Sequence, residues 1–149
     1  MSVIAIGSPA PALPGVSLSD EPRALFFYKV TCPVCQMAAP VAERLERFHP
    51  GIPVGIGQDP PDRLGDFAEH HGWSFPQTPD PPPYEVSDAY GIRVVPTLVL
   101  VHDGAVADVV ESWDRDGYNR VSSRLTELTG RPAAPISEEG DGLPPFRPG

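Results

Sequence analysis

The sequence is poor in cysteine, in lysine and in long apolar runs. Only two of its 149 residues are cysteine, which excludes a small fold held together by several disulfides. A single lysine, Lys29, accompanies ten arginines, and the net charge of -9 argues against nucleic acid or an anionic membrane surface as a partner. Because no apolar run reaches roughly 18 residues, the sequence predicts no membrane-spanning helix.

The first seven residues also lack the features of a secretory signal peptide. They contain neither a basic start nor a long apolar segment. We therefore expect a cytoplasmic protein, and leave open an exported mature form from which a leader has been removed. In a reducing cytoplasm, a close pair of cysteines beside a strand and a helix is more typical of a catalytic site than of a structural disulfide.

The two cysteines, Cys32 and Cys35, form a CxxC motif between a predicted strand and a predicted helix. Residues 24–30 are mostly apolar and β-prone, and apolar side chains then recur every three or four residues from Met37 to Phe48. A thiol in the first turn of a helix faces unpaired backbone N–H groups and the positive end of the helix dipole, which favour the thiolate. We expect Cys32 to be the nucleophile and Cys35, one turn along the same face, to be the resolving thiol.

Two less reactive interpretations of the motif stay open. A CxxC pair supplies half of a structural zinc site, but the sequence has no second cysteine pair and its four histidines lack zinc-finger spacing. The cysteines could also be inert core residues, since free cysteine is commonly buried. We favour a redox pair and expect neither a metal nor another cofactor.

The segment from Phe26 to Leu45 resembles the active-site region of the thioredoxin superfamily. Pro40 lies five residues after the second cysteine, where thioredoxins carry a helix-kinking proline. Val95-Pro96, which precedes an apolar, strand-like run, resembles the cis-proline of that superfamily. The resemblance implies an α/β thioredoxin fold, with a central mixed β-sheet flanked by helices, and it adds Pro96 to Cys32 and Cys35 as a catalytic-site residue.

Other segments resemble the redoxin branch of this superfamily, which includes peroxiredoxins and the thiol reductases of cytochrome maturation. Residues 7–11 are similar to the Gly-x-x-Ala-Pro opening of redoxins. Between the βαβ and ββα halves, the sequence around Asp59, Asp80 and residues 85–92 resembles a redoxin-type insertion. Its part from residue 73 to 83 holds five prolines, so we expect a surface loop or edge segment there, followed by a short helix over 84–90.

The remaining pattern predicts the other elements of the two halves. Residues 52–57 indicate a buried parallel strand, and Asp59-Pro60 resembles an N-cap with proline at the first position of a helix. Residues 97–111, with Asp-Gly at their centre, predict a β-hairpin. Residues 114–129 place apolar side chains on one face, as in a helix that covers a sheet.

The domain organisation follows from a change of composition after Arg131. We predict one thioredoxin-like domain over residues 1–130 and a Pro-rich C-terminal tail over 131–149. Five of the eighteen residues after Arg131 are proline, and few are apolar. Docking of the tail through Ile136, Leu143 or Phe146 is left open.

Three positions depart from the thioredoxin pattern. Phe26 stands where thioredoxins have a buried aspartate that accepts a proton, Thr31 replaces an aromatic residue, and Pro33-Val34 replaces Gly-Pro. Some group must take the proton of Cys35 before this thiol attacks a mixed disulfide. The residues considered for this role, or for stabilising a thiolate, are Asp59, Asp80, Glu85 and Lys29.

The sequence thus predicts a thiol–disulfide oxidoreductase. Cys32 attacks a protein or small-molecule disulfide, Cys35 resolves the intermediate, and Pro96 holds a backbone edge for an extended substrate. The expected reductant is a thioredoxin reductase or another thiol protein. One alternative is a peroxiredoxin-like thiol peroxidase with antioxidant activity, although its Pro-x-x-x-Thr-x-x-Cys pattern, aligned on Cys35, requires proline at Tyr28 and threonine at Cys32. A non-catalytic thioredoxin-fold binding module is the other alternative.

Overall fold

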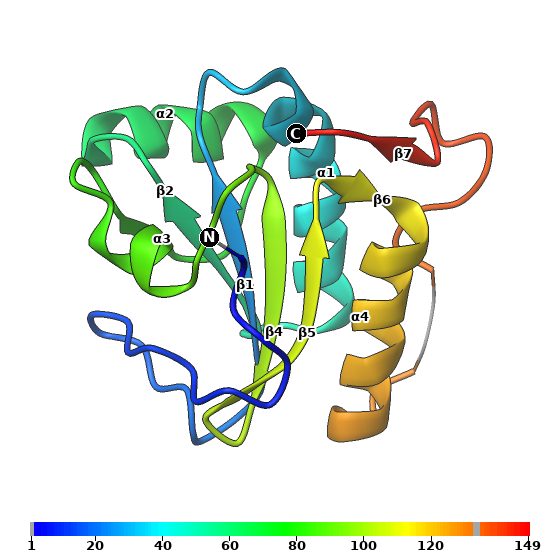
Figure 1. Cartoon of the computed structure of the whole chain (residues 1–149). Coiled ribbons are helices and arrows are strands. Elements are labelled where there is room, and N and C mark those ends of the chain that lie inside the picture. The colour runs from blue at the N-terminus through cyan, green and yellow to red at the C-terminus, as the bar shows by residue number, and fades with distance from the viewer. Residues whose placement is uncertain (1, 133–134) are drawn as a thin grey trace.

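The computed structural model describes residues 2–132 and 135–149, and its centre is a five-stranded mixed sheet (Figure 1). The strand order is β3-β2-β1-β4-β5, with β1–β2 and β2–β3 parallel and β1–β4 and β4–β5 antiparallel. The predicted α/β fold with a mixed sheet is confirmed. The strands are β1 (Arg23–Tyr28), β2 (Pro53–Gly57), β3 (Gln77–Pro79), β4 (Thr97–His102) and β5 (Ala105–Glu111).

Three helices pack against one face of this sheet. Their apolar residues form one core with strand residues such as Phe26 and Leu98, and Cys35 lies within that core. Alternation along β1 sends Phe26 and Tyr28 to this face and the residue between them to the other. The helices are α1 (Pro33–Phe48), α2 (Pro61–His71) and α4 (Arg115–Thr129).

The opposite face is covered by the N-terminal lead-in and a short helix, α3 (Glu85–Ala89). Leu13 of the lead-in and Tyr90 after α3 are buried against Phe27 and its neighbours on the strands. The Tyr90 hydroxyl donates a hydrogen bond to the Pro11 carbonyl at 2.6 Å, which fixes the lead-in to the insertion. The lead-in, residues 7–22, is rich in proline and forms no helix.

The hairpin between β4 and β5 turns at the predicted Asp-Gly pair. Asp103 and Gly104 both have positive φ, at 51° and 73°, which is the conformation that a tight two-residue hairpin turn requires. The final helix ends at Thr129 as predicted, with Gly130 as its C-cap, but it begins at Arg115, one residue later than predicted, because Asp114 is its N-cap residue. The sequence therefore predicted the ββα half closely.

The predicted start of α2 is also wrong. The N-cap of α2 is Pro60, and the helix begins at Pro61, one residue later than predicted. A residue before proline is pushed out of the helical region, and Pro60 accordingly is extended, with φ -63° and ψ 155°. The Asp59 carboxylate is thereby free of the capping role and accepts a hydrogen bond from the Val30 N–H at 2.9 Å.

The Pro-rich segment after the last helix is docked where the structure describes it. Ile136 is 1% exposed, Leu143 is partly buried and Phe146 is 54% exposed. Two short strands, β6 (Trp113–Asp114) and β7 (Phe146–Arg147), pair antiparallel and join this segment to the domain (Figure 1). We refer to residues 135–149 as the C-terminal segment.

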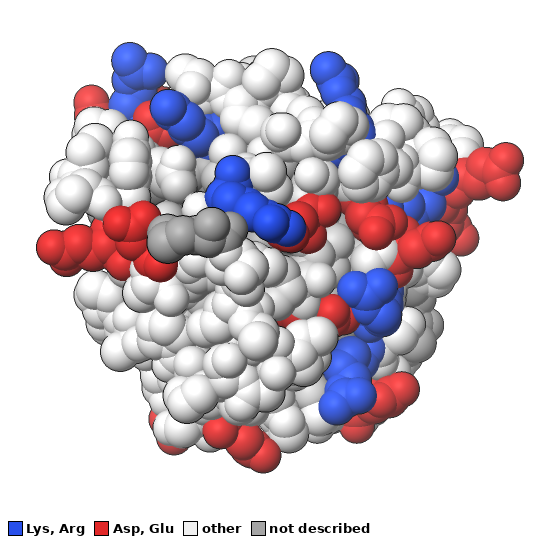
Figure 2. Space-filling model, viewed as in Figure 1, with Lys and Arg blue, Asp and Glu red and all other residues white. Residues whose placement is uncertain are grey.

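Charged side chains of both signs lie around a broad area without charged side chains on the face shown in Figure 2. The surface also carries ion pairs such as Arg93–Glu111 and Arg120–Asp108, with nitrogen–oxygen distances of 2.8 and 2.7 Å. The net charge of -9 is therefore not gathered into a single acidic field on this face.

Candidate active site

The CxxC motif lies at the turn between the central strand β1 and helix α1. Cys32 is the N-cap residue of α1, with extended backbone angles (φ -81°, ψ 116°), and Pro33 begins the helix. Proline suits this first position because its missing N–H would have no partner within the helix and its φ is already helical. The Cys32 N–H donates to the Lys29 carbonyl at 3.1 Å, which closes the turn.

The sulfur of Cys32 lies between the helix start and the loop before β4. It accepts a hydrogen bond from the Cys35 N–H at 3.2 Å, and its thiol donates to the Val95 carbonyl oxygen at 3.5 Å. The first contact uses one of the unpaired N–H groups at a helix start, where negative charge is favoured. Cys32 is half-buried, so its sulfur is accessible from one side.

Cys35 is fully buried beneath Cys32, in the core between α1 and the sheet. Burial raises the pKa of its thiol far above the ordinary value, and the hydrogen bond with Cys32 raises it further. Cys35 therefore remains a thiol at neutral pH while the protein is reduced. The two sulfurs are placed in different environments, although they are three residues apart.

The loop before β4 contains the predicted cis peptide bond, between Val95 and Pro96. Pro96 is buried, and its carbonyl accepts a hydrogen bond from the Ser112 N–H at 2.9 Å. Thr97 secures the other side of the loop by donating its hydroxyl to the Val94 carbonyl at 2.7 Å. The structure thus brings together all three predicted site residues, with Pro96 following the carbonyl that contacts Cys32.

The position of the missing aspartate is filled by an aromatic cluster. Phe26 is 1% exposed, and its ring lies 5.7 Å from those of Tyr28 and Trp73. The Tyr28 hydroxyl donates to the Gln77 side chain, and burial raises the pKa of Tyr28 above its ordinary value. The floor of the site is therefore apolar, and no carboxylate of β1 faces Cys35.

The structure separates the proposed proton acceptors. Asp59 is bonded to the turn itself through the Val30 N–H. Asp80 is buried and accepts hydrogen bonds from the Val86 and Ser87 N–H groups at the start of α3, so its role is structural. Glu85 is exposed in that helix, away from these contacts with the turn. Asp59 is the acidic candidate that the fold brings to the site.

Sequence reasoning missed Tyr118 as a neighbour of the cysteines. Its hydroxyl is buried and has no hydrogen-bond partner among residues 2–132 and 135–149. Burial raises the pKa of Tyr118 most, and negative charge on Cys35, Asp114 or Cys32 raises it further, which places this ring within electrostatic reach of both sulfurs. The sequence predicted only that Tyr118 lies on the buried face of the last helix.

Other kinds of site receive no support from the residues described. Within 2–132 and 135–149, no group of three or more His, Cys, Asp or Glu side chains is arranged to hold a metal ion. The helices over the same residues include none long and apolar enough to cross a bilayer.

Comparison with solved structures identifies the architecture. The thioredoxin domain of a thiol–disulfide oxidoreductase from Bacteroides vulgatus superposes with a TM-score of 0.69 at 20% identity, over 82% of this chain and 99% of that one. The chain has the thioredoxin fold. MTB DsbF, solved in mixed oxidised and reduced forms, superposes with a TM-score of 0.64 at 28% identity, over 75% of this chain and 84% of the other.

The chain is also similar in sequence to a curated relative. The thiol-disulfide oxidoreductase ResA from Halalkalibacterium halodurans is 32% identical over 83 residues, which are 53% of this chain and 47% of ResA. The chain therefore spans about half the length of the curated relative that it matches. No protein-family model matches the sequence. The predicted resemblance to the redoxin branch is confirmed by these relatives.

Proposed function

We propose that this thioredoxin-fold chain is a thiol–disulfide oxidoreductase. The observation that carries the proposal is the asymmetry of the two sulfurs. Cys32 is half-buried at a helix start and accepts an N–H hydrogen bond at 3.2 Å, whereas Cys35 is buried and burial raises its pKa. An accessible sulfur at a helix start, above a protected thiol, is suited to attack followed by resolution.

The reaction consists of two exchanges that together move two electrons to the substrate. The Cys32 thiolate attacks one sulfur of a substrate disulfide, the substrate S–S bond breaks, and the departing thiolate takes a proton from water. Cys35 then loses its proton and attacks the Cys32 sulfur, which releases the second substrate thiol and leaves a Cys32–Cys35 disulfide. A thiol reductant, such as a thioredoxin reductase or another thiol protein, returns the pair to the reduced form.

The proton of Cys35 needs an acceptor, and we assign this role to Asp59. Its carboxylate is hydrogen-bonded to Val30 in the turn, and the buried position used by thioredoxins is occupied by Phe26. Replacement by Asp59→Asn should slow the second exchange and leave the first unchanged, because only the second requires deprotonation of Cys35. Single-turnover kinetics that follow both thiols separate the two steps.

The Val95–Pro96 loop is proposed as the substrate edge. The Val95 carbonyl lies 3.5 Å from the Cys32 sulfur, so backbone that pairs with this loop would bring a disulfide to that sulfur. We propose an extended segment of a disulfide-bonded protein, or a small disulfide, as the substrate. Cytoplasmic location remains a proposal, which fractionation of cells that carry a tagged chain would test.

The site supports peroxide reduction less well than disulfide exchange. The threonine that binds peroxide in the peroxiredoxin pattern would fall on Cys32, and its proline would fall on Tyr28. A site without that hydroxyl loses stabilisation of the charge that develops on the leaving oxygen. An antioxidant role through direct peroxide reduction is therefore not proposed.

Trapping of the intermediate tests the proposed function. Cys35→Ser should accumulate a mixed disulfide with substrate, because the first exchange proceeds and the second cannot. Cys32→Ser, which keeps one cysteine, is the matched control and should trap nothing. Non-reducing gels of cells that express each variant give the readout, and adducts with neither variant, or equally with both, would contradict the assignment.

A further inference from the structure

The C-terminal segment reaches the Val95–Pro96 loop. Gly149 N–H donates to the Ser112 hydroxyl at 3.1 Å, and its backbone lies directly against the peptide unit between Val95 and Pro96. A Cβ atom on residue 149 would come within 2.8 Å of the Val95 carbonyl carbon and 3.4 Å of the Pro96 nitrogen. Only glycine can approach this closely without moving the loop or the segment.

The path of the segment to this loop is set by backbone hydrogen bonds along β6. Trp113 pairs with Arg147, and Asp114 pairs with Phe146. The Trp113 indole donates to the Pro144 carbonyl at 2.7 Å, and the Arg115 N–H donates to the Pro145 carbonyl at 3.0 Å. Figure 1 shows β7 at the same end of the molecule as the start of α1.

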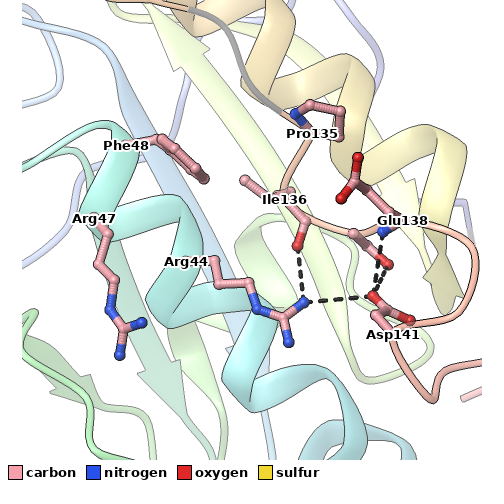
Figure 3. A pocket seen from close by; sticks show the side chains of 8 residues that line it. Arg44, Arg47, Phe48, Pro135, Ile136, Glu138 and Asp141 are labelled. Atoms are coloured by element: carbon pink, nitrogen blue, oxygen red, sulfur yellow. Dashed lines mark hydrogen bonds and ion pairs between the residues drawn. The ribbon is translucent and has the colours of Figure 1, made fainter.

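The start of the segment is held by a polar cluster around Asp141. Its carboxylate accepts hydrogen bonds from the Ser137 hydroxyl at 2.6 Å and from Arg115 at 3.2 Å, and the Ser137 bond is the largest cause of its pKa, which is lowered to about 2. Arg44 of α1 reaches both Asp141 and the Ile136 carbonyl, at 3.4 and 3.0 Å (Figure 3). This cluster, the anchor of the segment, joins it to α1 through Arg44 and to α4 through Arg115.

The two parts of the segment differ in how firmly they are held. Ile136 and Ser137 are buried at the anchor, whereas Phe146, Arg147 and Gly149 are exposed and are fixed mainly through backbone atoms. Few buried apolar contacts and exposed backbone hydrogen bonds characterise parts of a protein that open locally. The outer part, residues 146–149, can therefore detach while the anchor remains in place.

We propose that residues 146–149 are an internal competitor for the substrate edge. They occupy the peptide unit at Val95, which the proposed function assigns to an extended substrate, and this inference rests on that function. A protein disulfide must displace the segment before its backbone pairs there. A small disulfide needs only the Cys32 sulfur, so the segment selects against extended substrates until it is released.

Two substitutions at opposite ends of the segment release it by different means. Gly149→Val places a side chain against Val95 and forces residues 146–149 away from the Val95–Pro96 loop. Asp141→Ala removes the anchor without touching the loop or the cysteines. Gly65→Ala is the matched control, because a Cβ at that position in α2 meets no atom of the described residues within 4 Å. Circular dichroism checks that each variant is folded.

The experiment compares a large and a small probe of the same sulfur. Reduced protein is alkylated with a polyethylene-glycol maleimide or with iodoacetamide, and is assayed for reduction of insulin and of a small aromatic disulfide. In both release variants, alkylation by the large maleimide and reduction of insulin should be at least about threefold faster than in the wild type, because the fraction of open protein rises. The rates of the release variants with the small probes, and all rates of the Gly65→Ala control, should change by less than about threefold.

The outcomes separate the two proposals. Equal ratios of large-probe to small-probe alkylation in the wild type and both release variants would overturn the internal competitor, whatever the enzymatic activity. Failure of every protein to reduce either disulfide, with the alkylation ratios still changed, would overturn the proposed function while the role of residues 146–149 as an internal competitor stands.

Discussion

The active-site turn, residues 28–36, and the C-terminal segment both reach the Val95 peptide unit, but they are built in different ways. The turn depends on local chemistry, because a strand ends, a proline begins a helix and the N–H of Cys35 meets the Cys32 sulfur at 3.2 Å. The segment depends on partners far away in sequence, such as Arg44 and Asp141, which are 97 residues apart. Local order thus provides the reactive sulfur, and long-range order controls access to it.

The largest expected effect is on the free energy of unfolding, and it compares Phe26, beneath the active-site turn, with Phe146 of the C-terminal segment. Phe26→Ala should lower the free energy of unfolding by about 3 to 5 kcal/mol, because a fully buried ring leaves a cavity beneath the turn. Phe146→Ala, in the exposed part of the C-terminal segment, should change it by less than about 0.5 kcal/mol. Urea denaturation measures both, and similar losses for the two would show that β7 belongs to the core.

An intermediate effect is expected at the anchor of the segment. Asp141→Ala should lower the free energy of unfolding by about 1.5 to 3 kcal/mol, because hydrogen bonds to a charged group are lost. Since the folded pKa of Asp141 is lowered to about 2, its contribution is present above the unfolded pKa and is lost as pH falls through the folded value. The difference in the free energy of unfolding between the wild type and Asp141→Ala should therefore shrink in acid. A difference that does not depend on pH would contradict this account.

The smallest expected effect tests the orphaned hydroxyl beside the cysteines. Tyr118→Phe removes a buried O–H that has no partner in the part of the chain that the structure describes, so the free energy of unfolding should stay unchanged or rise by up to about 1 kcal/mol. Thermal unfolding of the reduced protein gives the comparison. A loss of more than about 1 kcal/mol would mean that the hydroxyl has a partner in solution, such as a water molecule.

The same contrast explains what could be predicted from the sequence. The CxxC at a strand-to-helix turn, the Asp-Gly hairpin and the proline before β4 are each signalled within a few residues, and all three are found as predicted. The start of α2 failed because the second of two prolines excludes Pro60 from the helix, so the capping role of Asp59 is lost. That failure leaves Asp59 available for the turn.

The positions that escaped prediction depend on three-dimensional neighbours. Tyr118 follows helical periodicity as an ordinary core residue, and nothing in its surroundings along the chain indicates Cys35. Docking of the C-terminal segment was left open because prolines and acidic residues are typical of unfolded tails. Its hydrogen bonds join Asp141 to arginines of two helices, a combination that no local pattern signals.

The asymmetry of the two cysteines is the central claim, and competitive alkylation tests it most directly. Reduced native protein is treated briefly with iodoacetamide across neutral and alkaline pH, and the labelled fraction of each cysteine is read by mass spectrometry. Cys32 should be labelled at least about ten times faster than Cys35, because Cys35 is buried and its pKa is raised. After denaturation the two rates should become similar. Equal and slow labelling of both cysteines in the native protein would contradict the assignment of Cys32 as the nucleophile.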